Sequence, residues 1–305
     1  MKAYRKIFFF FLLLFITATH IEAQVSEDVL RTDVEFLSDT LCAGRAAGTR
    51  GNVEAAGYIL RRLSALGYEA CVQSFEIDSD RVGHNILAGA PAVNGVLNVP
   101  NYKSPSKAKP LIMLLAYYDG LGILNGRMYP GADSNASGVA ALLSIAERVK
   151  GREDVLMVFL DGHNANLSGA AALRKALKER RISLVANIDI IGSTLAPVDK
   201  YWPDFLIALG AERHRLLLEE CNKGLMLHYY HTYYRSRTFT DLFYRRAGDH
   251  KDFLADGHHS ILFTSGITDN TNKPSDTFDT LDYEVFAKRV EFISRFIENY
   301  GRSYY

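Results

Sequence analysis

The stretch "PLIMLLAYYDG" (residues 110–120) decides the fold. An uninterrupted apolar run of this length is typical of a strand that is covered on both faces of a sheet, and the polar Asp119 follows where such a strand would end. The same pattern returns in "DVLMVFLDG" (154–162), "LVANIDIIG" (184–192) and "HSILFTSG" (259–266). Short buried strands separated by helical segments predict a three-layer α/β/α sandwich with a mixed, mostly parallel central sheet.

Segments with helical periodicity precede and separate these strands. The stretch "SEDVLRTDVEFLSD" (26–39) has its apolar residues on one stripe, and a second helix is expected over 53–66, ended by Gly67. Further helices are expected from Ala136 and over 167–179. These helices supply the two outer layers of the predicted sandwich.

The first residues have the pattern of a secretory signal peptide. Lys2, Arg5 and Lys6 precede an apolar run over 7–16, which is roughly half of the ~20 residues that a membrane-spanning helix needs. We therefore expect residues 1–23 to be a cleaved signal peptide and residues 24–305 to be a single domain. The protein would then be exported to the periplasm or the extracellular space, with no transmembrane segment after cleavage.

The composition excludes one class of partner and leaves the cysteines open. Acidic and basic residues number 35 each, so the formal net charge is zero and no nucleic-acid partner is expected. Cys42, Cys71 and Cys221 permit one disulfide with one thiol left over, although buried free thiols are an equal alternative. Within the stretch 202–246, the run "LHYYHTYYRSRTF" (227–239) is rich in Tyr, His and Arg. It predicts a β-like segment with aromatic side chains along a pocket rim or surface, and an aromatic wall for a substrate is the alternative.

Polar residues follow three of the predicted strands. They occupy 117–119, 161–164 and 189–192, and in open α/β sheets ligands bind outside the carboxyl ends of the strands. A further stretch, "YPGADSNASGVAALLSIAERV" (129–149), runs from a tight turn into a small-residue helix. The sequence therefore predicts a functional site where these four stretches meet.

Five motifs together resemble the secreted zinc aminopeptidases of peptidase family twenty-eight, which include bacterial leucyl aminopeptidases and, more distantly, glutaminyl cyclases. In the order and spacing of that family they are "LLAYYDGLG" (114–122), "YPGADSNASGVAALLSIAERV" (129–149), "VFLDGHNANLSGAAALRKAL" (158–177), "VANIDIIG" (185–192) and "GDHKDFLADGHHSILFTSGITDNTNKPSDTFDTLDYE" (248–284). The resemblance covers nearly the whole mature chain and implies the same α/β fold.

The resemblance also implies a site of two zinc ions, bound by two His, two Asp and a Glu, with a second Glu as the general base. In this sequence Asp189 is the one ligand position that keeps its residue type. The general-base position holds His163, a role that is doubtful for an imidazole, and Asp133 is a possible substitute metal ligand beside the bridging position. The other ligand positions hold side chains unsuited to zinc, namely Tyr117, Ser134, Asn164 and Asn272.

We therefore predict a secreted pseudopeptidase that has kept the aminopeptidase fold without its zinc chemistry. No cofactor is expected. The former active site would bind a peptide end or a small amine-bearing ligand in a pocket lined by Tyr117, Ser134, His163, Asn164, Asp189 and Asn272.

Two catalytic alternatives remain open. In the first, an active metallo-aminopeptidase holds a rearranged, mononuclear zinc site with Asp133, His163, Asp189 and His250. In the second, Ser134, His163 and Asp189 act as nucleophile, base and orienting acid.

The same residues also have purely structural interpretations. Asp133 and Asn135 could cap the helix that begins near Ala136, and the Asp189 carboxylate could accept backbone hydrogen bonds. Asp249 and His250 could begin a short helix, and His258 and His259 could introduce a strand.

Overall fold

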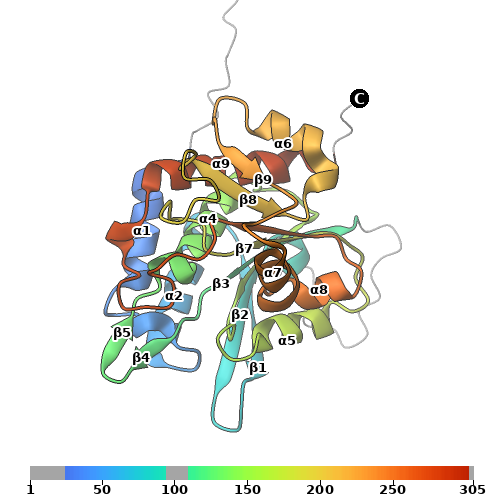
Figure 1. Ribbon diagram of the computed structural model, residues 1–305. Helices are drawn as coiled ribbons and strands as arrows, with labels where there is room; N and C mark the ends of the chain where they lie inside the picture. Colours follow the sequence, from blue (N-terminus) through green and yellow to red (C-terminus); the bar gives the residue numbers. More distant parts are fainter. Residues whose placement is uncertain (1–24, 94–108, 302–305) are drawn as a thin grey trace, which may run out of the picture.

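A mixed sheet forms the centre of the molecule (Figure 1), in a computed structural model that describes residues 25–93 and 109–301. Its strands are β1 (Ala70–Glu76), β2 (Val82–Ala88), β3 (Leu111–Tyr117), β6 (Val155–Leu160), β7 (Ile182–Ile188), β8 (Phe205–Leu209), β9 (His228–Tyr230) and β10 (Ser260–Thr264). They lie in the order β1-β2-β6-β3-β7-β10-β8-β9. A separate hairpin is formed by β4 (Gly122–Leu124) and β5 (Arg127–Tyr129).

The pairing of the strands confirms the predicted mixed, mostly parallel centre. Strands β6, β3, β7 and β10 run parallel as neighbours. The pairs β1–β2, β2–β6 and β8–β10 are antiparallel, and the edge strand β9 pairs with β8 in parallel orientation. The buried apolar runs of the sequence supply the four parallel strands. Their carboxyl ends consequently meet at one edge of the sheet, which is where the polar stretches follow.

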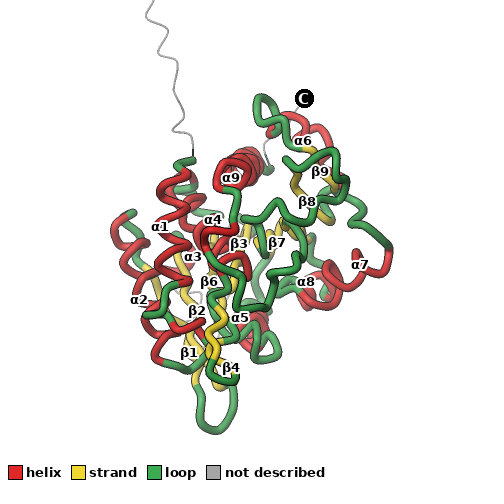
Figure 2. Tube along the Cα trace, turned by 60° about the vertical axis from the view of Figure 1, so that its left-hand side comes forward, coloured by secondary structure: helices red, strands yellow, loops and turns green. Residues whose placement is uncertain are grey.

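Helices cover both faces of this sheet. They are α1 (Glu27–Ser38), α2 (Arg50–Ala65), α3 (Ala90–Val93), α4 (Ser137–Arg148), α5 (Ser168–Ala176), α6 (Arg215–Cys221), α7 (Arg237–Asp241), α8 (Lys251–Ala255) and α9 (Tyr283–Asn299), with the short turns η1 (Ala43–Arg45), η2 (Ala132–Ala136), η3 (Glu212–His214), η4 (Leu242–Ala247) and η5 (Phe278–Thr280). In Figures 1 and 2, α1, α2, α4 and α9 lie on one side of the sheet, and α5, α7 and α8 lie on the other. This is the predicted three-layer sandwich.

The alternation of side chains along β3 divides the core between the two layers. Ile112, Leu114 and Ala116 pack in the large cluster under α1, α2, α4 and α9. Met113, Leu115 and Tyr117 face the smaller cluster under α5 and α8. Because side chains of a strand alternate between faces, Tyr117 lies on the α5 and α8 side.

Side-chain caps fix the starts of several helices. Ser26 accepts a hydrogen bond from the Val29 amide at the start of α1, and Asp282 accepts one from the Val285 amide at the start of α9. After α2, Gly67 has a φ of +79°, a conformation that ends a helix at little cost for glycine. The predicted terminator of this helix is confirmed.

Two expectations about element boundaries were wrong in part. The helix expected over 167–179 is the shorter α5, because Leu167 takes a left-handed conformation with φ of 56° and precedes the helix. The run 227–239, expected to be β-like, holds only the short β9 as a strand and otherwise forms turns and the start of α7. β9 pairs with β8 over three residues, so the rest of the aromatic run has no strand partner there.

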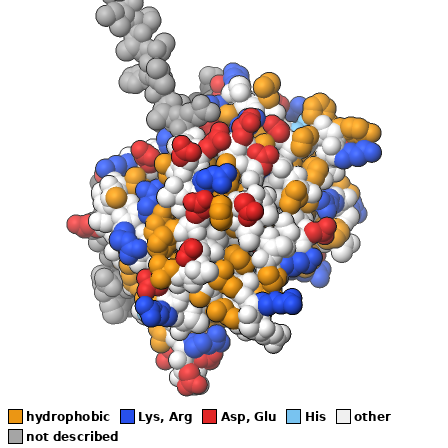
Figure 3. Space-filling view, turned by 90° about the vertical axis from the view of Figure 1, so that its left-hand side faces the viewer, with side chains coloured by type: hydrophobic (Ala, Val, Ile, Leu, Met, Phe, Trp, Pro, Cys, Tyr) orange, Lys and Arg blue, Asp and Glu red, His pale blue; other side chains and the backbone are white. Residues whose placement is uncertain are grey.

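The surface on the α1 and α2 side carries mixed charge. Figure 3 shows basic, acidic and apolar side chains interspersed over this face. Within residues 25–93 and 109–301, no helix combines the length and apolarity needed to cross a membrane. The proposed signal peptide lies outside these residues. No disulfide joins Cys42, Cys71 and Cys221, all of which lie within the described residues, and Cys42 and Cys221 are buried.

Candidate functional site

The carboxyl edge of the parallel strands brings the predicted polar stretches together. β3 ends at Tyr117, β6 is followed by the loop that carries His163, and β7 is followed directly by Asp189. The loop before α8 adds Asp249. We call Tyr117, His163, Asp189 and Asp249, with Asp119, the histidine cluster.

His163 occupies the centre of the histidine cluster. Its ring stacks on the Tyr117 ring, with centroids 3.7 Å apart and planes inclined by 10°. Its Nδ1 donates to Oδ2 of Asp249 over 2.8 Å, and 19% of the His163 side chain is exposed. Burial alone would lower the pKa of His163, but the Asp249 carboxylate, with Asp189 and Asp119, outweighs burial and raises this pKa to about 9. The cluster therefore holds an imidazolium at neutral pH.

Asp119 orders the loop that presents His163. Its buried carboxylate accepts hydrogen bonds from the His163 amide (2.8 Å) and the Asn164 amide (2.9 Å), and from the Asn164 side chain (3.3 Å). Burial raises the pKa of Asp119 to about 6, and the nearby His163 opposes that rise. The exposed Asn164 is thus tied back to the loop. Sequence reasoning missed the role of Asp119, although a carboxylate directly after a buried strand was a signal for it.

Asp189 contributes an acidic group with spare hydrogen-bonding capacity. Burial raises its pKa to about 6, against the opposing effects of His163 and of a hydrogen bond from Tyr117. Its Oδ1 is buried and has no partner among the described residues, and the same holds for Oδ1 of Asp249. No described backbone amide donates to Asp189, so the expectation that backbone hydrogen bonds hold this carboxylate was wrong.

Ser134 and Asp133 belong to a second group, which we call the serine loop, with Asp276. The Asp276 carboxylate accepts from the Ser134 hydroxyl (2.5 Å), from the Ser134 amide (3.1 Å) and from the Asp133 amide (2.7 Å). The peptide bond between Ser134 and Asn135 is cis. Asp276, which the sequence reasoning did not single out, therefore anchors the loop through three hydrogen bonds.

The Asp133 side chain has its own structural role in the serine loop. Its Oδ1 accepts from the Gly192 amide (2.7 Å) and the Ser137 hydroxyl (3.1 Å), while Oδ2 is buried and has no partner in the described part of the chain. Burial, reinforced by Asp276, raises the pKa of Asp133 to about 7. Asn135 accepts from the Gly138 amide at the start of α4, which confirms its expected capping role.

The proposed serine triad does not form. The Ser134 hydroxyl donates to Asp276, and the His163 Nδ1 pairs with Asp249 rather than with Asp189. Ser134 belongs to the serine loop and His163 to the histidine cluster, so the two side chains bind different carboxylates. The triad hypothesis is therefore wrong.

The remaining candidates lie apart from the histidine cluster or serve structural roles. His250 precedes α8 and its Nε2 contacts the Tyr244 carbonyl at 2.7 Å; burial lowers the pKa of His250 to about 4, so it is neutral. Asn272 is exposed in the loop after β10, with a φ of 59°. His258 and His259 directly precede β10, as expected.

The donor set does not fit a zinc pair. Across residues 25–93 and 109–301, no group of three or more His, Cys, Asp or Glu side chains is placed to hold a metal ion. His163 points its Nδ1 at Asp249, and Asp133 is held by Gly192 and Ser137. The expected convergence of Asp133, His163, Asp189 and His250 on one zinc ion is not found among these residues.

A cavity of about 20 Å³ reaches Asp189. Ile190, Gly248 and Phe243 also line it, and Phe243 belongs to η4. This volume holds roughly one water molecule or a group of that size. Of the pocket residues predicted from the sequence, only Asp189 lines this cavity.

Comparisons with known proteins agree with this geometry at the level of the fold. A family model described as Peptidase family M28 matches residues 98–297. The Alkaline phosphatase isozyme conversion protein of Escherichia coli (strain K12) is 24% identical in an alignment of 205 positions that covers 59% of this chain and 56% of that protein. The match thus spans little more than half of that curated relative.

Solved structures give the same picture over most of the chain. LapB from Legionella pneumophila superposes with a TM-score of 0.69 at 15% identity, over 92% of this chain and 73% of that chain. BSAP, a zinc aminopeptidase from Bacillus subtilis, superposes with a TM-score of 0.67 at 12% identity, over 90% of this chain and 95% of that chain. Porphyromonas gingivalis glutaminyl cyclase superposes with a TM-score of 0.64 at 15% identity, over 91% of this chain and 99% of that chain. At these identities the likeness establishes the fold.

Proposed function

This chain belongs to peptidase family M28, and from that premise we propose that it is an exported pseudopeptidase that binds the amino end of a peptide, or a small amine, without hydrolysing it. The observation that carries the proposal is the His163 imidazolium, stacked on Tyr117 and paired with Asp249. A fixed cation at the strand ends balances carboxylates that a metal would otherwise neutralise. The serine loop supports the same proposal, because Ser134 is held by Asp276.

The charges of the histidine cluster favour a cationic ligand. Asp119, Asp189 and Asp249 together outweigh the single positive charge of His163 when all three are ionised. The unpartnered Oδ1 atoms of Asp189 and Asp249 are acceptors that lack donors among the described residues. An ammonium group is about the size of the water that the 20 Å³ cavity would hold, and it supplies such donors.

Purified mature protein is expected to bind well below one zinc ion per chain after equilibration with zinc and gel filtration. It is also expected to release no product from leucine p-nitroanilide. The reason is that the described donors do not converge on a metal. Zinc content by mass spectrometry and the peptidase assay on one preparation check both points. The Bacillus subtilis zinc aminopeptidase serves as the positive control, and two bound zinc ions with chelator-sensitive hydrolysis would refute the proposal.

The binding half of the proposal has its own test with leucinamide as the probe. We expect leucinamide to bind and N-acetyl-leucinamide, which lacks the ammonium group, to bind at least roughly tenfold more weakly. Replacement of Asp189 by Asn should weaken the binding of leucinamide by a similar factor. Because the pKa of Asp189 is raised to about 6, affinity should fall as the pH drops through 6 and the carboxylate is protonated.

Calorimetric titration of wild type and Asp189→Asn from pH 5 to pH 8 checks this expectation. Asp199→Asn, on the loop after β7, is the matched control and should bind leucinamide like the wild type. Equal affinities for the free and the acetylated amide would contradict the proposed amine site. Such a result would leave the absence of zinc chemistry to be judged by the metal analysis alone.

A further inference from the structure

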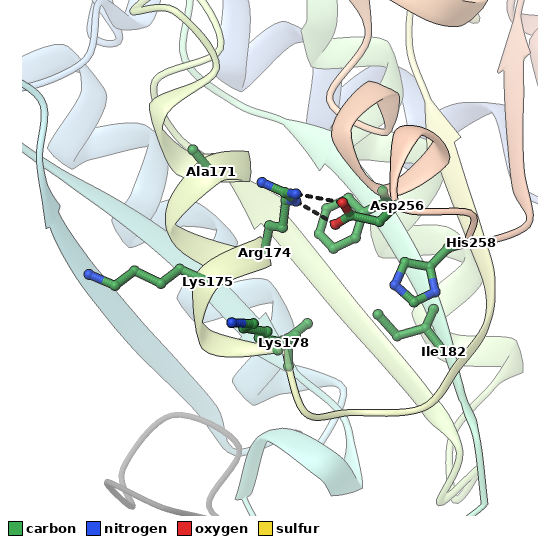
Figure 4. A pocket seen from close by; sticks show the side chains of 9 residues that line it. Ala171, Arg174, Lys175, Lys178, Ile182, Asp256 and His258 are labelled. Atoms are coloured by element: carbon green, nitrogen blue, oxygen red, sulfur yellow. Dashed lines mark hydrogen bonds and ion pairs between the residues drawn. The ribbon is translucent and has the colours of Figure 1, made fainter.

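A larger cavity lies between α5 and α8 (Figure 4). Its volume is about 570 Å³, which falls within the range of about 300–1,000 Å³ that is typical of small-ligand sites. Its lining residues Ile182 and His258 are at the start of β7 and just before β10, so it lies at the opposite end of the sheet from the histidine cluster. Asp189 follows the other end of β7, so the two sites are separated by the length of that strand, about 20 Å for its seven residues.

The walls of this cavity are rich in cationic side chains. Arg174, Lys175 and Lys178 come from α5 and the turn after it, and the carboxylate among the lining residues is Asp256. Arg174 and Asp256 form a bidentate ion pair with both distances at 2.5 Å, and Figure 4 shows them facing each other across the cavity. This pair is electrically neutral and fixes the spacing of the two walls.

The two lysines are left uncompensated. Both are exposed, and neither has an ion pair within residues 25–93 and 109–301. In Figure 4, Lys175 extends outward from the rim, whereas Lys178 lies below Arg174 and to the left of Ile182. The carboxyl end of α5 contributes about half a negative elementary charge, which offsets only part of the two positive charges. The cavity is thus locally positive in a chain whose formal net charge is zero.

The floor of the cavity is apolar. Phe253 and Leu177 are 1% and 2% exposed and belong to the core under α5 and α8, and Ile182 packs against that core. A ligand that fills the cavity would therefore meet carbon atoms below and cations at the sides. His258 stands on the side opposite Lys175 and offers a ring nitrogen.

We propose that this cavity binds a small organic dianion, a phosphate monoester with a compact apolar body. The phosphate would lie against Lys178 and His258, and the apolar body would pack on Ile182 and Leu177. Lys178 would contact the dianion directly, and Lys175 at the rim adds to the positive field without contacting it. A phosphate monoester is close to doubly charged above its second pKa of about 6. The neutral Arg174–Asp256 pair stays intact in the complex.

Phenyl phosphate is the probe for this proposal, titrated by calorimetry into the full-length mature protein at pH 8 and low salt. We expect saturable binding that weakens as salt is added, and no binding of the neutral benzyl alcohol. Lys178→Gln should weaken the binding of phenyl phosphate by roughly tenfold, because a charge-assisted hydrogen bond is lost. Ala171→Trp, on the exposed lining of α5, should block the cavity without changing its charge.

Lys200→Gln is the matched control, since Lys200 is an exposed lysine that lies outside this cavity, and it should bind phenyl phosphate like the wild type. Circular dichroism establishes that each variant is folded. Unchanged affinity in both Lys178→Gln and Ala171→Trp would overturn the site. If inorganic phosphate binds as tightly as phenyl phosphate, the proposal that the ligand has an apolar organic body is refuted. If phenyl phosphate does not bind at millimolar concentration, the whole proposal is refuted.

Discussion

Replacement of Arg45 by methionine is expected to lower the free energy of unfolding by about 4 kcal/mol. The Arg45 side chain is fully buried and donates to the carbonyls of Tyr118 (2.8 Å), Pro130 (2.7 Å), Gly131 (2.9 Å) and Leu37. Methionine has no donors, so these carbonyls would lose their partners, at about 1–3 kcal/mol for each that stays dry. Urea denaturation followed by circular dichroism measures the loss.

The Arg45 contacts join the end of α1, the end of β3 and the turn before the serine loop, so the same variant should loosen that loop. Arg45→Lys is expected to restore little of the lost free energy of unfolding, because one ammonium group cannot make the several hydrogen bonds that the planar guanidinium makes. Arg50→Met is the control: its side chain is 90% exposed and makes one long ion pair, 3.8 Å from Glu54. Its effect should stay within about 0.5 kcal/mol. A loss for Arg45→Met as small as that would contradict the role assigned to Arg45.

Replacement of Asp249 by Asn is expected to move the pKa of His163 from about 9 to below its ordinary value near 6.5. The substitution removes the largest effect that favours the charged ring, while the burial that disfavours it remains. NMR titration of the His163 ring signals, assigned with a His163→Gln variant, measures the change. A pKa that stays near 9 in Asp249→Asn would refute the proposed source of the imidazolium.

The same pair predicts how stability changes with pH. The folded pKa of His163 lies above its unfolded value, so this stabilisation is complete below about pH 6.5 and is lost as the pH rises through 9; the shift corresponds to about 3 kcal/mol. Wild-type stability should therefore decline over this interval, and Asp249→Asn should flatten the decline. Asp252→Asn removes a carboxylate paired with Lys251 on the same helix and should keep the wild-type slope.

The sequence predicted the layers and the position of the site because both depend on local patterns. The apolar run before Asp119 and its counterparts before Asp161 and Asp189 specify buried strands, and parallel strands end at one edge. The motifs around these strands, such as the loop with Ser134, also identified the family. A predicted helix boundary was wrong where a single residue departed from the pattern: Leu167 has a left-handed backbone, so α5 begins after it.

The partners of the site residues could not be predicted in this way. His163 pairs with Asp249 across 86 residues, and Ser134 binds Asp276 across 142 residues. Each pairing depends on which loops the strand order places side by side, and the sequence offered other acidic candidates for both. The choice of Asp249 over Asp189 for His163 consequently had to come from the folded chain.

The sequence by itself determined that this protein is a sandwich of the M28 type with unusual side chains at the positions where zinc ligands are expected. It could do so because residue types and hydrophobic periodicity are properties of short segments. Only the tertiary structure decided what those side chains do instead: a histidine held by an aspartate, a serine bound to a loop carboxylate, and a cationic cavity between α5 and α8. These are contacts between distant segments, and they exist only once the sheet has set the distances between them.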